Sequence, residues 1–129
     1  MNRRFTILIH DFPFLHWDLL VEDGETLRTW RLHEEPDQSL KIVCEPLPDH
    51  RLIYLDYEGP VSRDRGNVQQ WTTGRCELSV PAEGRIELEL SSPRLTGKMS
   101  IRQENDGRWC CYPPGAELPP ASAEGAASD

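Results

Sequence analysis

The segment FTILIHDFPFLHWDLLVEDGETLRTW, residues 5–30, predicts the fold of this chain. Apolar side chains recur at every second position over residues 5–10 and again over 16–22, which is the pattern of half-buried β-strands. The turn sequence DGE (23–25) follows, and glycine tolerates the positive φ that a tight hairpin needs before a third strand over 27–32. We therefore expect the chain to begin with consecutive antiparallel strands.

The rest of the chain repeats this pattern. Further strands are expected over residues 40–45, 52–57, 67–72, 75–80, 85–90, 97–103 and 107–112. Turn residues separate them, including Gly74 between the runs over 67–72 and 75–80, and no segment has the pattern of a helix of three turns. Strands spaced about ten residues apart with short turns are typical of an antiparallel sandwich or closed barrel, so the predicted class is all-β with little helix.

The last 17 residues, PPGAELPPASAEGAASD (113–129), have a different composition. They contain no aromatic or β-branched residue, and such a segment buries too little apolar surface to offset the entropy of ordering it. We predict one folded domain over residues 1–112 and a disordered, acidic, Pro/Ala-rich tail over 113–129.

The chain is acidic, with a formal net charge of −8. The predicted tail holds three of the acids and no base, so residues 1–112 carry 14 bases and 19 acids, or −5. This balance argues against tight, sequence-independent binding to long nucleic acid, which needs a broad basic face. It is compatible with the handling of a strand end, where a metal ion and a few local cations supply the positive charge.

The cysteines and the apolar segments indicate a compartment. Cys44, Cys76, Cys110 and Cys111 include no CxxC spacing, so we expect buried, reduced thiols rather than a zinc ribbon or redox motif. The apolar run near the N-terminus is too short for a signal peptide, and no stretch approaches transmembrane length. We expect a cytoplasmic protein with no membrane contact.

Two histidines and an aspartate predict a metal site. His10 ends the first strand and His16 begins the second, so hairpin pairing places them nearly opposite each other, about 5.5 Å apart at Cα. Asp18 lies two residues after His16 and leaves the same face of its strand. Two imidazoles and one carboxylate on one side suit Mn²⁺, Fe²⁺ or Zn²⁺ with open positions for substrate or water. Separate surface histidines are the plainer alternative.

A second cluster follows at residues 48–54. His50 and Tyr54 are four residues apart, so in a strand they share a face and can point into one pocket, where they could hold a phosphate oxygen or pass a proton to a leaving alkoxide. A turn histidine and a core tyrosine are the alternative. The polar loop GPVSRDRG (59–66), which carries Arg63 and Arg65, is either a flap over the site or an ordinary solvated loop.

Taken together, these motifs resemble the 3′-phosphoesterase domain of bacterial DNA ligase D. The segment HDFPFLHWDLLVEDGETLRTW (10–30) is similar to that family's opening His-Asp, four residues, His-Tyr-Asp-x-Arg-Leu-Glu and downstream Leu-x-x-Trp. The segment DHRLIYLDYEGPV (49–61) is similar to its Asp-His-Pro-Leu-x-Tyr-x-x-Phe-Glu-Gly. Weaker similarity continues in order, so the resemblance spans residues 5–112.

The resemblance implies a small antiparallel β-barrel of about eight strands that binds Mn²⁺, or Zn²⁺ or another divalent ion. It implies removal of 3′-terminal ribonucleosides and 3′-phosphates from DNA or primer-template ends during non-homologous end joining. His10, His16 and Asp18 match the metal ligands, and His50 and Tyr54 match the phosphate-contacting pair. The residues expected to act in catalysis are His50, Tyr54 and His16, and those expected to bind phosphate are His50, Tyr54 and Arg51.

The chain departs from the family at cationic positions. Leu20 replaces the family's Arg two residues after the metal-binding Asp, Glu34 replaces its Lys, and Ile42 replaces a further base. Loss of one cation that stabilises a transition state reduces the rate by about 10²-fold or more. Arg31, Arg51 and Arg63 are candidates to take their place.

Three functions therefore remain open. The first is a stand-alone metal-dependent phosphoesterase acting on 3′ ends or on a smaller phosphoester. The second is a catalytically impaired module that binds metal, nucleic-acid ends or a partner such as an end-joining ligase or polymerase. The third treats His16, Asp18 and His50 as the HxD…H iron triad of an oxygenase.

Overall fold

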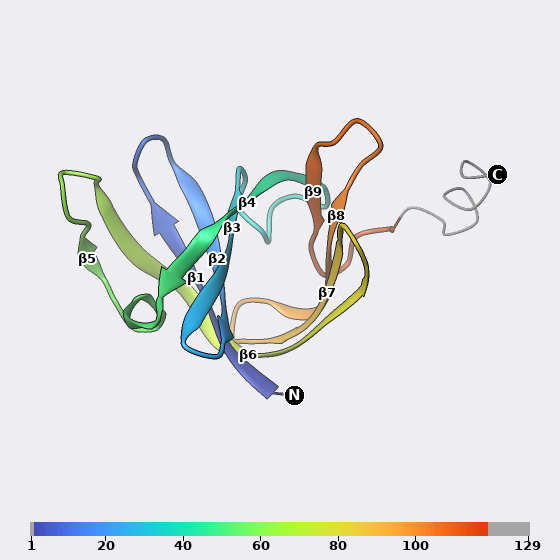
Figure 1. Ribbon diagram of the computed structural model, residues 1–129, viewed down its shortest axis with the longest axis horizontal. Helices are drawn as coiled ribbons and strands as arrows, with labels where there is room; N and C mark the ends of the chain where they lie inside the picture. The colour runs from blue at the N-terminus through green and yellow to red at the C-terminus, as the bar shows by residue number, and fades with distance from the viewer. Residues whose placement is uncertain (1, 119–129) are drawn as a thin grey trace.

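The computed structural model describes residues 2–118, which form one antiparallel sheet closed into a barrel (Figure 1). Its elements are β1 (Asn2–His10), β2 (His16–Asp23), β3 (Thr26–Leu32), β4 (Ile42–Arg51), the 3-10 helix η1 (Leu52–Leu55), β5 (Gly59–Pro60), β6 (Asn67–Ala82), β7 (Arg85–Ser91), β8 (Thr96–Gln103) and β9 (Trp109–Tyr112). Eight strands follow the order β1-β2-β3-β4-β9-β8-β7-β6, and pairing of β1 with β6 closes the ring. The short β5 pairs with the start of β6. The predicted all-β barrel is confirmed.

The expected strand over residues 52–57 is wrong. Instead, β4 extends to Arg51, and the chain then turns through η1. Only Leu55 of this turn is buried, while Ile53 is exposed. The run Leu52–Leu55 therefore lacks the buried face that a strand of the barrel would have. A short apolar run without alternation does not distinguish a strand from a helical turn.

The expected break at Gly74 is also wrong, because residues 67–82 form the single strand β6. A Cβ atom at Gly74 would lie 2.1 Å from the carbonyl oxygen of Ser91 on β7. Glycine is needed here for close approach of two backbones inside the sheet, and not for a turn.

Two apolar clusters occupy the two faces of the barrel wall. The interior core contains Phe5 and Ile7 of β1 with large side chains from β2, β3 and β6 to β9. Side chains of the opposite parity form a smaller outer cluster, whose buried members are Leu8, Leu20, Leu27, Leu55 and Val68. The segment from η1 to β5 covers this outer cluster, and Figure 1 shows both elements against one side of the barrel. This side carries the candidate site.

The cysteines and the residues after β9 are also the subject of predictions. The four cysteines are free and buried, as expected. Residues 113–118 continue from β9 through a turn in which the Ala116 N–H donates to the Pro113 carbonyl at 3.0 Å. The rest of the predicted disordered tail, residues 119–129, lies outside the described residues. Within the described part, no helix is long and apolar enough to cross a membrane.

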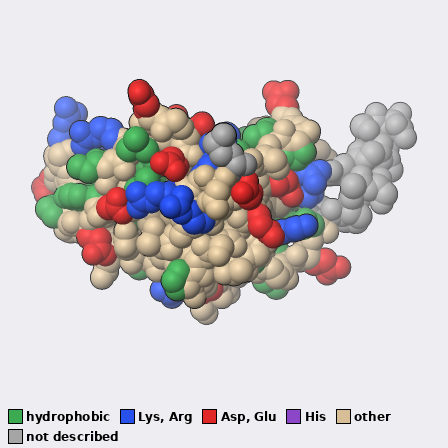
Figure 2. Space-filling model, turned by 90° about the horizontal axis from the view of Figure 1, so that it is seen from below, with side chains coloured by type: hydrophobic (Ala, Val, Ile, Leu, Met, Phe, Trp, Pro, Cys, Tyr) green, Lys and Arg blue, Asp and Glu red, His purple; other side chains and the backbone are tan. Residues whose placement is uncertain are grey.

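The surface charge is mixed. On the face shown in Figure 2, acidic and basic side chains of the described residues are interspersed, and no broad basic area forms. This distribution agrees with the negative net charge, and positive charge on this face is local.

Candidate metal centre and adjoining cleft

The β1–β2 hairpin brings His10, His16 and Asp18 together. In its register His10 pairs with His16, and Leu8 pairs with Asp18, so all three side chains leave the outer face of the barrel wall. The ligand atoms they offer lie within 4.8 Å of one another. His10 Nδ1 is 3.3 Å from Asp18 Oδ2, and His16 Nε2 is 3.1 Å from Asp18 Oδ1. The predicted convergence of the three residues is present.

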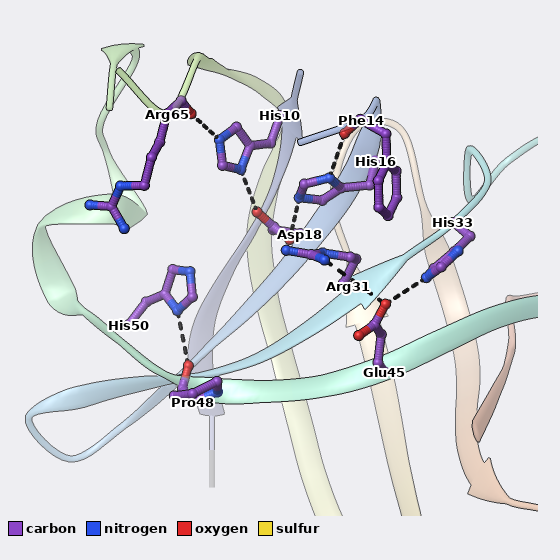
Figure 3. A network of polar contacts seen from close by, with 10 residues as sticks. All are labelled: His10, Phe14, His16, Asp18, Arg31, His33, Glu45, Pro48, His50 and Arg65. Carbon is purple, nitrogen blue, oxygen red and sulfur yellow. Dashed lines mark hydrogen bonds and ion pairs between the residues drawn. The ribbon is translucent and has the colours of Figure 1, made fainter. Parts of the chain in front are cut away.

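The outer nitrogen of each imidazole is hydrogen-bonded to a backbone carbonyl (Figure 3). His10 Nε2 donates to the carbonyl of Arg65 at 2.8 Å, and His16 Nδ1 donates to the carbonyl of Phe14 at 2.8 Å. A carbonyl oxygen only accepts, so each of these nitrogens carries the ring proton. In a neutral ring the other nitrogen then has a lone pair, and both lone pairs face Asp18. Such outer-shell bonds fix the tautomer of metal-binding histidines.

These three residues fit a divalent cation. His16 is fully buried and Asp18 nearly so, yet His16 Nε2 and Asp18 Oδ1 make no hydrogen bond. A lone pair facing a carboxylate oxygen at 3.1 Å is repulsive unless the ring is protonated or a cation lies between them. Two imidazole nitrogens and a carboxylate oxygen are ligands for Mn²⁺, Fe²⁺ or Zn²⁺. The buried, unpaired donor atoms of this site therefore match what a metal ion requires.

The site also perturbs the ionisation of its members. Burial alone would raise the pKa of Asp18, but the hydrogen bond from His10 and the close approach of the His16 ring outweigh it and lower that pKa to about 2. The hydrogen bond to Asp18 raises the pKa of His10, against the effect of burial. Asp18 is therefore a carboxylate throughout the neutral range, as a metal ligand must be.

The loop over residues 59–66 reaches this site. Its Arg65 carbonyl accepts the hydrogen bond from His10, and the side chain of Asp11 accepts one from the backbone N–H of Asn67 just after the loop, at 2.7 Å. Arg63 and Asp64 both have positive φ, at 63° and 59°, which is uncommon for residues with side chains. The loop is thus a wall of the site rather than a separate solvated segment.

Next to the three candidate metal ligands lies a cleft of about 750 Å³. His10 and Asp18 line one part of it, and the predicted phosphate-contacting residues His50, Tyr54 and Arg51 line another. Its remaining basic lining residues are Arg31, Arg63 and Arg65. The structure therefore brings the predicted site residues to one cleft, although their roles in catalysis and phosphate binding stay predictions.

The three positions where cations were expected from the family pattern do not line this cleft. Leu20 is fully buried in the outer cluster, and Ile42 is fully buried in the interior core. Glu34 is exposed and accepts a hydrogen bond from the Ser39 hydroxyl at 2.6 Å. The positive charge of the cleft comes from other positions.

His50 and Tyr54 meet, but not as neighbours on one strand. His50 is at the end of β4 and Tyr54 lies in η1, and their rings pack edge to face with centroids 5.9 Å apart. His50 Nδ1 donates to the carbonyl of Pro48 at 3.0 Å, which leaves Nε2 as the free ring nitrogen (Figure 3). This arrangement presents one imidazole nitrogen for a ligand of the cleft.

Sequence reasoning missed the groups that orient the two histidines. They are the backbone carbonyls of Phe14 and Arg65, and no sequence signal identifies them because every residue carries a carbonyl. The fourth histidine, His33, lies outside the cleft lining and donates to Glu45 at 2.9 Å.

Comparison with known proteins assigns the chain to a family. The family model described as the DNA ligase D 3′-phosphoesterase domain matches residues 9–103. The chain is 29% identical over 112 residues to the multifunctional non-homologous end joining protein LigD of Pseudomonas aeruginosa, covering 79% of this chain and 13% of that protein. It is 25% identical over 117 residues to the protein of the same name from Mycobacterium bovis, covering 84% of this chain and 15% of that protein. The chain thus spans about one seventh of the length of these curated relatives. Because the family model covers most of the barrel, the chain belongs to the DNA ligase D 3′-phosphoesterase domain family.

Proposed function

We propose that this domain is a metal-dependent phosphoesterase that removes 3′-phosphates and 3′-terminal ribonucleosides from DNA ends during repair. The observation that carries the proposal is the convergence of two imidazole lone pairs and a buried carboxylate beside a cleft with four arginines. Family membership and relatives named for non-homologous end joining support the substrate class. Mn²⁺ is the ion we propose, and Zn²⁺ or another divalent ion also suits these ligands.

Each part of the cleft has a proposed role. His10, His16 and Asp18 would hold a divalent ion, which would neutralise charge on the phosphate and could activate a water. In the imidazolium form both ring nitrogens of His50 carry a proton, and Nε2 would then donate a hydrogen bond to a phosphate oxygen or give its proton to the leaving alkoxide. Tyr54 and Arg51 add a hydroxyl and a positive charge at the same end of the cleft. His16 takes part in catalysis as a metal ligand.

The test is Mn²⁺-dependent release of inorganic phosphate from a 3′-phosphate primer-template, and of a nucleoside from a primer that ends in a ribonucleotide. The His16→Ala variant is expected to lose both activities. His33→Ala is the matched control, because His33 lies outside the cleft lining and is expected to keep them. Absence of turnover on these and on generic phosphodiester substrates would contradict the proposal.

A second candidate is a module that binds DNA ends or an end-joining partner without catalysis. It is favoured by Leu20 and Glu34, where an apolar and an acidic residue occupy positions at which the family pattern has cations. Stable co-purification with a ligase or polymerase, without hydrolysis of any end, would support this candidate. For either function we propose a cytoplasmic location, which the four reduced and buried thiols support.

A further inference from the structure

Arg31 lies in a row of charged side chains that crosses three strands. In the sheet register Asp18 of β2 pairs with Arg31 of β3, and Arg31 pairs with Glu45 of β4. Residues paired in this way project from the same face of the sheet. Figure 3 shows the Arg31 guanidinium between the Asp18 and Glu45 side chains, and Arg31 lines the same cleft as the metal ligands.

The hydrogen-bond donors of Arg31 are almost unused. Its Nε is buried and has no hydrogen-bond partner among the described residues. Its nearest acidic atom is Glu45 Oε2, 3.9 Å from Nη1, which is beyond hydrogen-bond length. The same Glu45 oxygen already accepts a hydrogen bond from His33 at 2.9 Å. A guanidinium has five N–H donors, and a buried donor without a partner destabilises the protein. The unused donors of Arg31 are therefore suited to a hydrogen-bond acceptor that belongs to a ligand.

Arg31 is also less exposed than the other arginines of the cleft. Its guanidinium carbon lies 5.4 Å from the centre of the Phe14 ring, and its side chain is 21% exposed. Arg51 and Arg63 are exposed, and Arg65 directs two of its nitrogens to Ser62. A preorganised guanidinium loses less conformational entropy when it binds an oxyanion.

We propose that Arg31 is the phosphate-binding cation of this cleft, and that it grips two oxygens of a phosphate group whose other oxygens face the metal ligands. The planar fork of arginine matches a phosphate in this bidentate way. This role rests on the proposed function for the identity of the substrate. It assigns specificity for a phosphate to Arg31, a residue of β3.

Calorimetric titration of inorganic phosphate into the Mn²⁺-saturated protein tests this assignment. The Arg31→Ala variant is expected to bind phosphate about 10- to 100-fold more weakly, as for loss of a charge-assisted hydrogen-bond pair. Arg31→Lys, which keeps the charge and loses the fork, is expected to lie between that variant and the wild type. Affinity for Mn²⁺, measured separately, is expected not to fall, because Arg31 offers no metal ligand.

Arg28→Ala is the matched control. Arg28 lies on the same strand and also packs over an aromatic ring, that of Trp30 at 5.1 Å, but it projects from the other face of β3 and does not line the cleft. Its removal is expected to leave phosphate binding unchanged. Glu45→Gln removes the acidic neighbour of Arg31 and is expected to preserve or tighten phosphate binding. If Arg31 and Glu45 formed only a structural ion pair, Glu45→Gln and Arg31→Ala would instead weaken phosphate binding equally.

The outcomes separate the inference from the proposed function. Phosphate binding by Arg31→Ala equal to that of the wild type would overturn the inference, even if the wild type hydrolyses 3′-phosphates. Arg31-dependent phosphate binding without hydrolysis by the wild type would support the inference and contradict the proposed function. No phosphate binding by the Mn²⁺-saturated wild type would overturn the inference as well.

Discussion

The replacement Asp18→Asn tests the candidate metal centre most directly. It exchanges one oxygen for an amide nitrogen and changes the size of the side chain very little. It removes the only negative charge among the three candidate ligands, His10, His16 and Asp18. The expected result is the loss of Mn²⁺-dependent stabilisation while the barrel still folds.

The size of the metal effect follows from mass action. An ion that binds only the folded state stabilises it by RT ln(1 + [L]/Kd), which is about 2.7 kcal/mol at a free concentration of 100 times Kd. For a domain of this size, 1 kcal/mol corresponds to roughly 3–5 °C in Tm. The wild-type protein is therefore expected to gain about 10 °C in Tm at that concentration of Mn²⁺, and the variant only a small fraction of it.

The metal-free proteins are also expected to differ in stability. The folded protein holds the pKa of Asp18 at about 2, below its ordinary value of 3.8. A lowered carboxyl pKa stabilises the folded state above the unfolded pKa, and this contribution disappears as pH falls through the folded pKa. The difference corresponds to about 2 kcal/mol at neutral pH. We expect metal-free Asp18→Asn to unfold below the wild type at pH 7 and the two to converge towards pH 2.

The assay is differential scanning calorimetry of both proteins with EDTA and with a series of Mn²⁺ concentrations. Asp56→Asn is the control, because Asp56 is an exposed carboxylate that pairs with Arg4 at the surface. A surface pair of this kind contributes about 1 kcal/mol or less, so this variant should keep the full Mn²⁺ response. A rise in Tm for Asp18→Asn equal to that of the wild type would refute the assignment of Asp18 as a ligand.

Three further predictions concern the glycines and the thiols. Gly74→Ala is expected to destabilise the barrel by about 2–3 kcal/mol in urea unfolding, because its Cβ would lie 2.1 Å from the Ser91 carbonyl oxygen, and an unchanged midpoint would contradict this packing. Gly66→Ala places a Cβ 2.3 Å from Asp11 Oδ1 and should displace the loop that orients the metal site, weakening Mn²⁺ binding about tenfold by titration. Gly107→Ala, which also has positive φ but meets nothing within 4 Å, should not weaken it. Burial raises the pKa values of the four thiols, those of Cys44, Cys76, Cys110 and Cys111. At pH 8 the folded protein should therefore react with a disulfide reagent far more slowly than the protein unfolded in urea. All four thiols are expected to react in urea.

The N-terminal hairpin could be predicted because its signals agree. Alternation over β1 and β2 identifies the face that points into the barrel, and the five residues between His10 and His16 leave few ways to pair the two strands. The same alternation places Asp18 on the face of the two histidines. The convergence of His10, His16 and Asp18 therefore followed from local pattern and strand geometry alone.

The wall of the cleft could not be predicted in the same way. The strand expected over residues 52–57 is a 3-10 turn, and His50 meets Tyr54 across that turn. The loop carbonyl that orients His10 comes from Arg65, 55 residues away in sequence. Such contacts depend on how the segment from η1 to β5 packs on the outer cluster. No periodic pattern in the sequence predicts tertiary packing of this kind.

The proposed phosphate-binding role of Arg31 gives a reason for the apolar residue at position 20. Leu20 of β2 pairs with Thr29 of β3, one step along the ladder from the pair of Asp18 and Arg31, so positions 20 and 31 are diagonal neighbours on one face. Diagonal neighbours lie roughly 7–8 Å apart, within the reach of a long side chain, so a guanidinium from either position can serve the same anion. With Arg31 in the cleft, Leu20 is free to add a fully buried side chain to the outer cluster on which η1 packs. On this proposal the cation and the apolar contact are supplied by separate strands, and an anion site whose positive charge is local is compatible with the acidic net charge of the chain.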